Sequence, residues 1–201
     1  MTRALTRTEL LRRGIGGGAL LTITGAELIA PSAPAEAAVL PDSDLVYLRL
    51  LIAAELLKGD FEAQALRSGK LAAPAATPVR RMRADDSAHY NGLSVLMAEG
   101  GEMPATSADI DFSYPRGSFA SEKAIARLAW KLTTLTMSAY LGAVESVQTS
   151  QLRLPLGQIA ANEAQQLSSL AQLMGRPLVG GAFAPALRID AVSAELDEYE
   201  S

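Results

Sequence analysis

Apolar residues recur every three to four positions along most of the chain after residue 41, which is the spacing of amphipathic α-helices. Four stretches carry this pattern, and we find no stretch that alternates apolar and polar residues as a half-buried strand does. The expected helices span residues 42–67, 79–98, 121–148 and 155–175. The pattern therefore predicts an all-α fold.

Residues that stop or start helices mark the ends of these stretches. Gly69 and Gly100 follow the first and second helices, and Gly175 follows the fourth; glycine is favoured directly after a helix because it adopts the left-handed conformation without strain. Pro155 suits the first turn of the fourth helix, where its missing N–H costs nothing. The proline- and alanine-rich stretch over residues 72–78 is interpreted as a loop.

Residues 99–119 have no helical period and contain Gly, Pro, Ser and Asp. A connection of this length is long for two neighbouring helices, but it is what a helix-to-helix crossover along a bundle needs. We therefore expect an up-down four-helix bundle over residues 39–187, with a long crossover between the second and third helices. Residues 188–201 are expected to form an acidic C-terminal tail, with a short helix over residues 189–199.

Charged residues interrupt the apolar faces of the first two helices. On the first helix, Glu55 follows Leu51 by four residues and Ile52 by three, so it lies on the inward side. On the second helix, Asp86 and His89 are three residues apart within the apolar stripe. Residues at i and i+3 share one face of a helix, so both side chains can reach one point.

The fourth helix shows a similar interruption. Glu163 and Gln166 stand in the middle of a stripe that includes Leu156, Ile159 and Leu170. Their spacing again places both on the inward face. The candidate metal-site residues are Glu55, Asp86, His89, Glu163 and Gln166.

Two interpretations of this cluster stay open. Carboxylate and imidazole groups suit iron, manganese or zinc, so the cluster is a candidate site for a transition-metal ion. A buried unpaired carboxylate costs several kcal/mol, and a protonated His89, raised carboxylate pKa values or a basic partner would also compensate it; Lys131 on the third helix is one basic candidate. A basic side chain at the point where the carboxylates meet would favour a metal-free polar network.

Composition excludes several classes of function. The chain contains no cysteine, so it forms neither a disulfide nor a thiolate metal site. It has 18 basic and 22 acidic residues without a basic stripe interleaved with aromatic residues, so nucleic acid is not an expected partner.

The first 38 residues follow the plan of an export signal peptide. Arg12 and Arg13 precede a weakly apolar run over residues 14–30, and Ala35 and Ala37 provide the small residues of a cleavage site. The paired arginines resemble a twin-arginine signal. We therefore expect an exported protein, periplasmic, in the cell envelope or extracellular, without a stable membrane span once the signal is removed.

The chain from about residue 42 to 187 resembles the ferritin-like domain family, including its exported and desiccation-related members. The resemblance rests on Glu55 six residues before Phe61, on the pairs Asp86/His89 and Glu163/Gln166, and on the Ala-Tyr-x-Gly-Ala motif around Tyr140. It implies a bundle in which a Glu from each of two helices and a Glu-x-x-His pair from each of the other two hold two ions.

Three positions depart from the family's pattern. Thr133 stands where the third helix of the family carries a Glu, Gln166 replaces a His, and Asp86 replaces a Glu. The resemblance therefore implies at most one ion, iron first with manganese or zinc as alternatives, and no ferroxidase-type turnover. The other hypothesis is a non-catalytic structural or envelope-stress bundle with a vestigial metal site.

Overall fold

The computed structural model describes residues 40–200, and the predicted export signal over residues 1–38 lies outside this range. Within it, the elements are helices and a short 3-10 turn, and the only bridge of β type is isolated, between Phe112 and Glu200. The elements are α2 (Asp42–Arg67), α3 (Ala73–Glu99), α4 (Glu122–Ser146), α5 (Ser150–Leu173), α6 (Ile189–Leu196) and the 3-10 turn η1 (Asp197–Tyr199). This confirms the predicted all-α fold.

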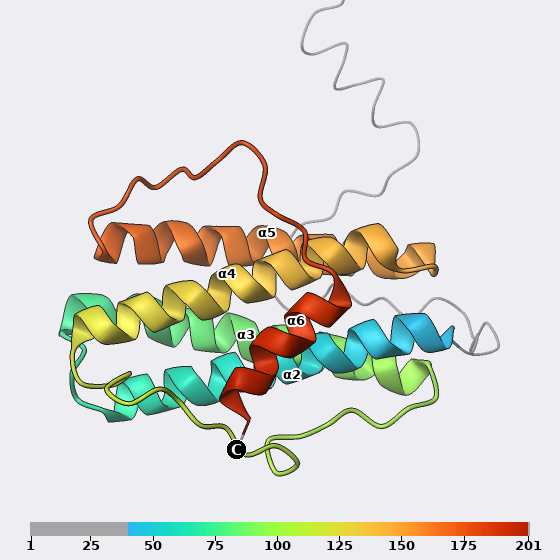
Figure 1. Ribbon diagram of the computed structural model, residues 1–201, viewed down its shortest axis with the longest axis horizontal. Helices are drawn as coiled ribbons and strands as arrows, with labels where there is room; N and C mark the ends of the chain where they lie inside the picture. The colour runs from blue at the N-terminus through green and yellow to red at the C-terminus, as the bar shows by residue number, and fades with distance from the viewer. Residues whose placement is uncertain (1–39, 201) are drawn as a thin grey trace, which may run out of the picture. The chain divides into compact units, whose positions relative to one another are not determined.

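The four long helices form a bundle (Figure 1). Helix α2 contacts α3 and α4, and α5 contacts α4 and α3, so each long helix has two neighbours. Leucine and isoleucine side chains from these helices fill the space between them and are almost completely buried. They include Leu48, Leu51, Ile52, Leu57, Leu93, Leu132, Leu156 and Leu170. Each contributes roughly 1.5–3 kcal/mol by leaving water, which makes this core the main stabilising element.

Two helices begin earlier than the sequence predicted. Helix α3 starts at Ala73 rather than at residue 79, so the stretch interpreted as a loop is the first turns of the helix, with Pro78 inside it. Helix α5 starts at Ser150 rather than at residue 155, which places Pro155 inside it. Each proline is the sixth residue of its helix, beyond the first turn whose N–H groups lack an intrahelical partner, so each removes one backbone hydrogen bond. The side chains that the extra turns bury offset this cost.

The segment between α3 and α4 is fixed to α2 by an aromatic side chain. In Figure 1 it runs from the end of the bundle where α3 stops to the end where α4 starts. Tyr114 donates its hydroxyl hydrogen bond to Leu57 O (3.1 Å) and to Asp60 Oδ2 (2.9 Å). Its ring lies 5.7 Å from that of Phe61 and 5.3 Å from that of Phe119, centre to centre. Such aromatic contacts fix the path of the segment along the bundle.

The C-terminal segment, expected as an acidic tail, folds onto the bundle. Helix α6 contacts both α2 and α4, and Val192, Leu196 and Tyr199 are buried. The backbone N–H of Ser113 donates to Tyr199 O (2.7 Å), which joins this segment to the connection before α4. The acidic residues of the segment lie on its outer side. The charged face of the segment is therefore opposite the apolar face that packs on the bundle.

Gly142 permits close approach of the chain before α6 to helix α4. A Cβ atom at this position would lie 1.9 Å from the carbonyl oxygen of Leu187. The neighbouring backbone N–H of Leu187 donates to Ser138 O (2.9 Å). No residue with a side chain fits here without displacing the backbone, which explains glycine in the middle of a buried helix.

Asp44 ties the start of α2 to the turn between α4 and α5. Its buried carboxylate accepts hydrogen bonds from the backbone N–H of Gln148 (2.9 Å) and of Thr149 (2.8 Å). Burial alone would raise the pKa of Asp44, but these hydrogen bonds outweigh it and the pKa is lowered. The carboxylate of Asp44 thus links the start of α2 to the end of α4 and the start of α5.

Candidate metal centre

Four side chains from three helices meet in the interior of the bundle. Glu55 comes from α2, Asp86 and His89 from α3, and Glu163 from α5. One potential ligand atom from each lies within 4.8 Å of the others. The three carboxylate residues are at most 2% exposed, and the side chain of His89 is 11% exposed. The structure thus brings together four of the five residues singled out in the sequence as one ligand set.

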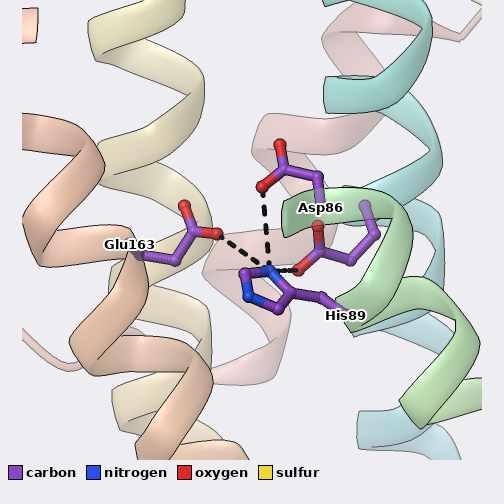
Figure 2. Close-up of side chains that lie close together, drawn as sticks. Asp86, His89 and Glu163 are labelled. Carbon is purple, nitrogen blue, oxygen red and sulfur yellow. Dashed lines mark ion pairs between the residues drawn. The ribbon is translucent and has the colours of Figure 1, made fainter. Parts of the chain in front are cut away.

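The ring of His89 lies at the centre of this group. Its Nδ1 atom is 3.4 Å from Oε1 of both Glu55 and Glu163, and 3.7 Å from Asp86 Oδ1. Figure 2 shows Glu163 from α5 and Asp86 from α3 reaching toward this one ring nitrogen. Burial alone would lower the pKa of His89, but the carboxylates of Glu163 and Glu55 raise it to about 9. Without a metal ion, His89 therefore supplies a positive charge to the cluster.

Glu55 is held in place by a tyrosine from α4. The hydroxyl of Tyr140 donates a hydrogen bond to Glu55 Oε1 (2.5 Å), and both side chains are buried. Burial raises the pKa of Glu55 to about 7, although His89 and Lys58 act in the opposite direction. Burial and the charge of Glu55 also raise the pKa of Tyr140 well above its ordinary value. Tyr140 thus acts as a neutral donor that positions a carboxylate.

A buried lysine faces the same carboxylates, and the sequence analysis did not identify it. The Nζ atom of Lys58 lies 3.0 Å from Asp86 Oδ1 and 2.5 Å from Glu163 Oε2. Burial alone would lower the pKa of Lys58, but the charges of Glu163 and Asp86 raise it, so this side chain is a cation. The spacing of Lys58 could have indicated that it points inward, because it lies one helical turn after Glu55 on the same face.

The prediction that Lys131 would be the basic partner is wrong. Lys131 lies at the surface of α4, where its Nζ atom pairs with Glu195 (3.1 Å) and Glu198 (3.0 Å). Helix α4 is apolar on most of its circumference, so its sequence pattern does not show which of its few polar residues point inward.

Gln166 lies beside the carboxylates and bonds to the lysine as well. Its Oε1 accepts a hydrogen bond from Lys58 (3.1 Å), and its Nε2 donates to Asp86 Oδ1 (2.7 Å) and to Asn162 Oδ1 (3.1 Å). Both ends of the amide are thereby engaged with protein groups. Gln166 is therefore a member of the polar cluster on the side of Lys58 rather than a free ligand beside His89.

Two further polar residues in the interior are Glu62 and Thr133, which are each 1% exposed. Among the residues that the structure describes, no N–H or O–H donor reaches either oxygen of Glu62 or the hydroxyl of Thr133, and Glu62 meets the carboxyl group of Asp86. Burial and the negative charge of Asp86 raise the pKa of Glu62 well above its ordinary value. Glu62 was not identified in the sequence, although it lies one turn beyond Lys58 in α2.

Several ligand atoms on the His89 side have only weak contacts or none. Within residues 40–200, no hydrogen bond reaches Glu55 Oε2 or Asp86 Oδ2, and His89 Nδ1 meets Glu163 Oε1 in an ion pair of 3.4 Å, although all are buried. Buried polar atoms are almost always paired, so a cation would satisfy the carboxylate oxygens that are left over. Three carboxylates and one imidazole suit a single iron, manganese or zinc ion. The other side of the cluster is already filled by the ammonium group of Lys58.

A groove of about 330 Å³ between α2 and α3 connects the cluster with the surface. Glu55 and Asp86 form part of its wall, and Asp60, Arg83 and Tyr90 line it as well. Asp85, next to Asp86 in the chain, points outward and accepts a hydrogen bond from Arg81 (3.0 Å). The side chains of Glu55 and Asp86 themselves have no exposed surface, so the groove ends against these two candidate ligands.

One class of four-helix bundle proteins directs carboxylates and histidines into the bundle core. The fold and the cluster described above place this chain in that class. The sequence model of the ferritin-like domain matches residues 43–176, and the chain belongs to this family. A comparison with curated proteins found no match. Ferritin-like folds serve many functions, so the function has to be argued from the site itself.

Proposed function

We propose that this protein is an exported ferritin-like protein that binds a single transition-metal ion in the core of its bundle. Glu55, Asp86, His89 and Glu163 would hold the ion, which is iron, with manganese and zinc as alternatives. The observation that carries this proposal is the convergence of one ligand atom from each of these four residues to within 4.8 Å of one another in the interior of the bundle.

The charges of the cluster support one ion rather than two. Glu55, Asp86 and Glu163 supply three negative charges, and Lys58 supplies one positive charge. A divalent ion that displaces the proton of His89 would leave the cluster neutral, which keeps the cost of burying these groups low. An ion held there would act as a Lewis acid or a redox centre, while Tyr140 keeps Glu55 in position and the surrounding leucines exclude water.

A second candidate function is favoured by the contacts of Lys58. Lys58 and Gln166 together hydrogen-bond to Asp86, and Lys58 bonds to Glu163, without any metal. A buried network satisfied in this way fixes the register of the helices. The protein would then be a non-catalytic structural or envelope-stress bundle with a vestigial metal site.

Metal content separates the two functions. The domain is equilibrated with Fe²⁺ without oxygen, and separately with Mn²⁺ and Zn²⁺, then desalted and analysed for bound metal. We expect about one ion per chain, and at least a tenfold loss of affinity in His89→Ala, because a site that loses one of four ligands binds its ion poorly. Absence of bound metal in all three arms would favour the structural bundle.

The neighbouring residues Asp85 and Asp86 provide a matched control. Asp86→Asn removes a charge that faces the cluster, whereas Asp85→Asn removes a charge that faces Arg81 at the surface. We expect metal binding to be lost in the first variant and retained in the second. Equal loss in both would point to a general electrostatic effect instead of ligation.

Export is supported by the sequence of residues 1–38 alone. None of the helices within residues 40–200 is long and apolar enough to span a membrane. The test is to express the full chain in a bacterium and compare cell fractions with those of a variant in which Arg12 and Arg13 are both replaced by Lys. Secretion through a twin-arginine signal requires the arginine pair, so the variant should stay inside the cell. Equal export of both chains would rule out this route.

A further inference from the structure

Lys58 makes the contacts of a bound cation. Its ammonium group is buried, with 2% of the side chain exposed, and three oxygen atoms surround it. These are Glu163 Oε2 at 2.5 Å, Asp86 Oδ1 at 3.0 Å and Gln166 Oε1 at 3.1 Å. An ammonium group has three N–H donors, so the three acceptors engage all of them.

Asp86 and Glu163 lie between Lys58 and His89. Glu163 directs Oε2 at Lys58 and Oε1 at His89 Nδ1, which is 3.4 Å away. Asp86 Oδ1 lies 3.0 Å from Lys58 Nζ and 3.7 Å from His89 Nδ1. The cluster therefore has two adjacent positions that share two carboxylates: one beside His89 and Glu55, and one taken by the Lys58 ammonium.

We infer that Lys58 is a tethered cation at the position of a second metal ion, and that removal of its ammonium group opens a second metal site. This inference rests on the proposed function in that the position beside His89 is the one assigned to the first ion. It explains why the chain retains the carboxylates that would bridge two ions although the third-helix Glu and the second His of the family are absent.

Glu62 is the independent observation that points to a ligand at this position. It lies one turn after Lys58 in α2 and is 1% exposed, and among the residues described here neither of its oxygens accepts a hydrogen bond from an N–H or O–H donor; the carboxyl group that it meets is that of Asp86. When it is ionised, its charge stabilises the Lys58 ammonium group, as those of Glu163 and Asp86 do. A divalent ion carries one more positive charge than an ammonium group, and Glu62 is the carboxylate that would balance it.

The donor set at this position would be entirely oxygen. Carboxylates of Glu62, Asp86 and Glu163 and the amide oxygen of Gln166 suit Mn²⁺ or Fe²⁺. A groove of about 210 Å³ between α3 and α5 has Gln166 and Asn162 in its wall and ends against this side of the cluster, where Gln166 is 4% exposed. The second position thus has ligands and charge once the lysine is shortened or made neutral.

The test is the number of Mn²⁺ ions bound per chain in wild type and in Lys58→Met, which is one atom shorter than lysine and carries no charge. We expect about one ion in wild type and about two in Lys58→Met. The thermal unfolding temperature of Lys58→Met should rise by roughly 5–10 °C with saturating Mn²⁺ relative to chelator, because the added ion binds only the folded chain.

Three control variants make the result specific. Lys58→Arg keeps a cation and should bind one ion, as should Lys131→Met, which removes a lysine at the surface. The double variant Lys58→Met with Glu62→Gln should lose the additional ion. An additional ion that persists without Glu62 would overturn the assignment of that residue.

A folded Lys58→Met chain that binds no more Mn²⁺ than wild type overturns the inference and leaves the proposed function intact. The opposite failure is recognisable too. If wild type binds no ion and Lys58→Met binds one that survives His89→Ala, the proposed function fails and the inference stands. If Lys58→Met does not fold in chelator, the measurement is refolding in Mn²⁺, and Lys58→Gln is tested beside it. Failure of both to fold with Mn²⁺ overturns the inference, because a bound ion would replace the lost charge.

Discussion

Gly142 shows how strongly one position can depend on its surroundings. A Cβ atom there would overlap the carbonyl oxygen of Leu187, so Gly142→Ala forces the chain before α6 away from α4. We expect the free energy of unfolding to fall by about 1–3 kcal/mol, as is typical of overpacking. Chemical denaturation of the two proteins measures the difference.

The control is a glycine in an equivalent helix without this contact. Around Gly92 in α3, no described atom outside its own helix backbone lies within 4 Å of a Cβ. Gly92→Ala should therefore stabilise the protein by about 0.5–1 kcal/mol, because alanine loses less freedom on folding. Destabilisation of both variants by the same amount would contradict the steric explanation.

At this scale, the inward direction of Glu55, Asp86, His89 and Glu163 could be predicted because helical spacing fixes the face on which each Cα lies. The position of a lysine ammonium group could not be predicted in this way. Its four-carbon stem allows the charge to lie several ångströms from the Cα atom, toward solvent or toward the core. Lys58 and Lys131 both lie on helices of the core, and only the packed structure shows which one is buried.

At the scale of the elements, Asp44 joins three helix ends through two backbone hydrogen bonds. Asp44→Ala leaves the N–H groups of Gln148 and Thr149 without this acceptor, and we expect a loss of about 2 kcal/mol at pH 7. Asp42→Ala changes an exposed residue of the same turn and should alter stability by less than about 0.5 kcal/mol. Urea denaturation of the three proteins tests this.

The contribution of Asp44 depends on pH in a defined direction. Its pKa is lower in the folded chain than in the unfolded chain, so the stabilisation is present in full above the unfolded value of about 3.9. It is lost as the pH falls through the lowered folded value. The difference in stability between wild type and Asp44→Ala should therefore shrink below about pH 4, and a difference that stays constant down to pH 2 would contradict the assignment.

The existence and order of the four long helices could be predicted, whereas two of their starting points could not. The sequence rules treat Pro78 and Pro155 as residues of a loop or of the first turn. In the structure, each lies a few residues inside its helix, because the preceding turns bury Ala75 and Ala76 in α3 and Leu152 in α5. Burial outweighed local preference at these helix ends.

At the scale of the whole molecule, the C-terminal segment belongs to the core. Leu196→Ala removes a buried side chain from the contact between α6 and the bundle, and we expect a loss of about 2–5 kcal/mol. Leu178→Ala, at a residue that is 55% exposed, should change stability by no more than about 0.5 kcal/mol. Thermal unfolding followed by circular dichroism compares them, and equal effects would show that α6 contributes no packing energy.

The packing of this segment could not be read from its sequence because it is short and rich in acidic residues. A helix over residues 189–199 could be predicted, but an eight-residue helix has too few apolar positions to show whether they are covered. The contacts of Lys131 in α4 hold this segment on the bundle. Its ammonium group lies 5.5 Å from the centre of the Tyr199 ring and pairs with Glu195 and Glu198. These contacts join parts of the chain more than 60 residues apart.

The backbone hydrogen bond between Ser113 and Tyr199 can form only after residue 199 has been made, which limits the order in which the chain folds during synthesis. Helices α2 and α3 emerge before α4 and α5 and pack as neighbours in the sequence, whereas the side of the bundle that Tyr199 covers stays open until residue 199 has been made. Contacts between distant residues form slowly because the intervening chain must first be ordered. Between the synthesis of residue 114 and that of residue 199, the growing chain therefore leaves the ring of Tyr114 without the ring of Tyr199, which lies 6.1 Å from it in the folded chain, and such exposed apolar surface favours aggregation.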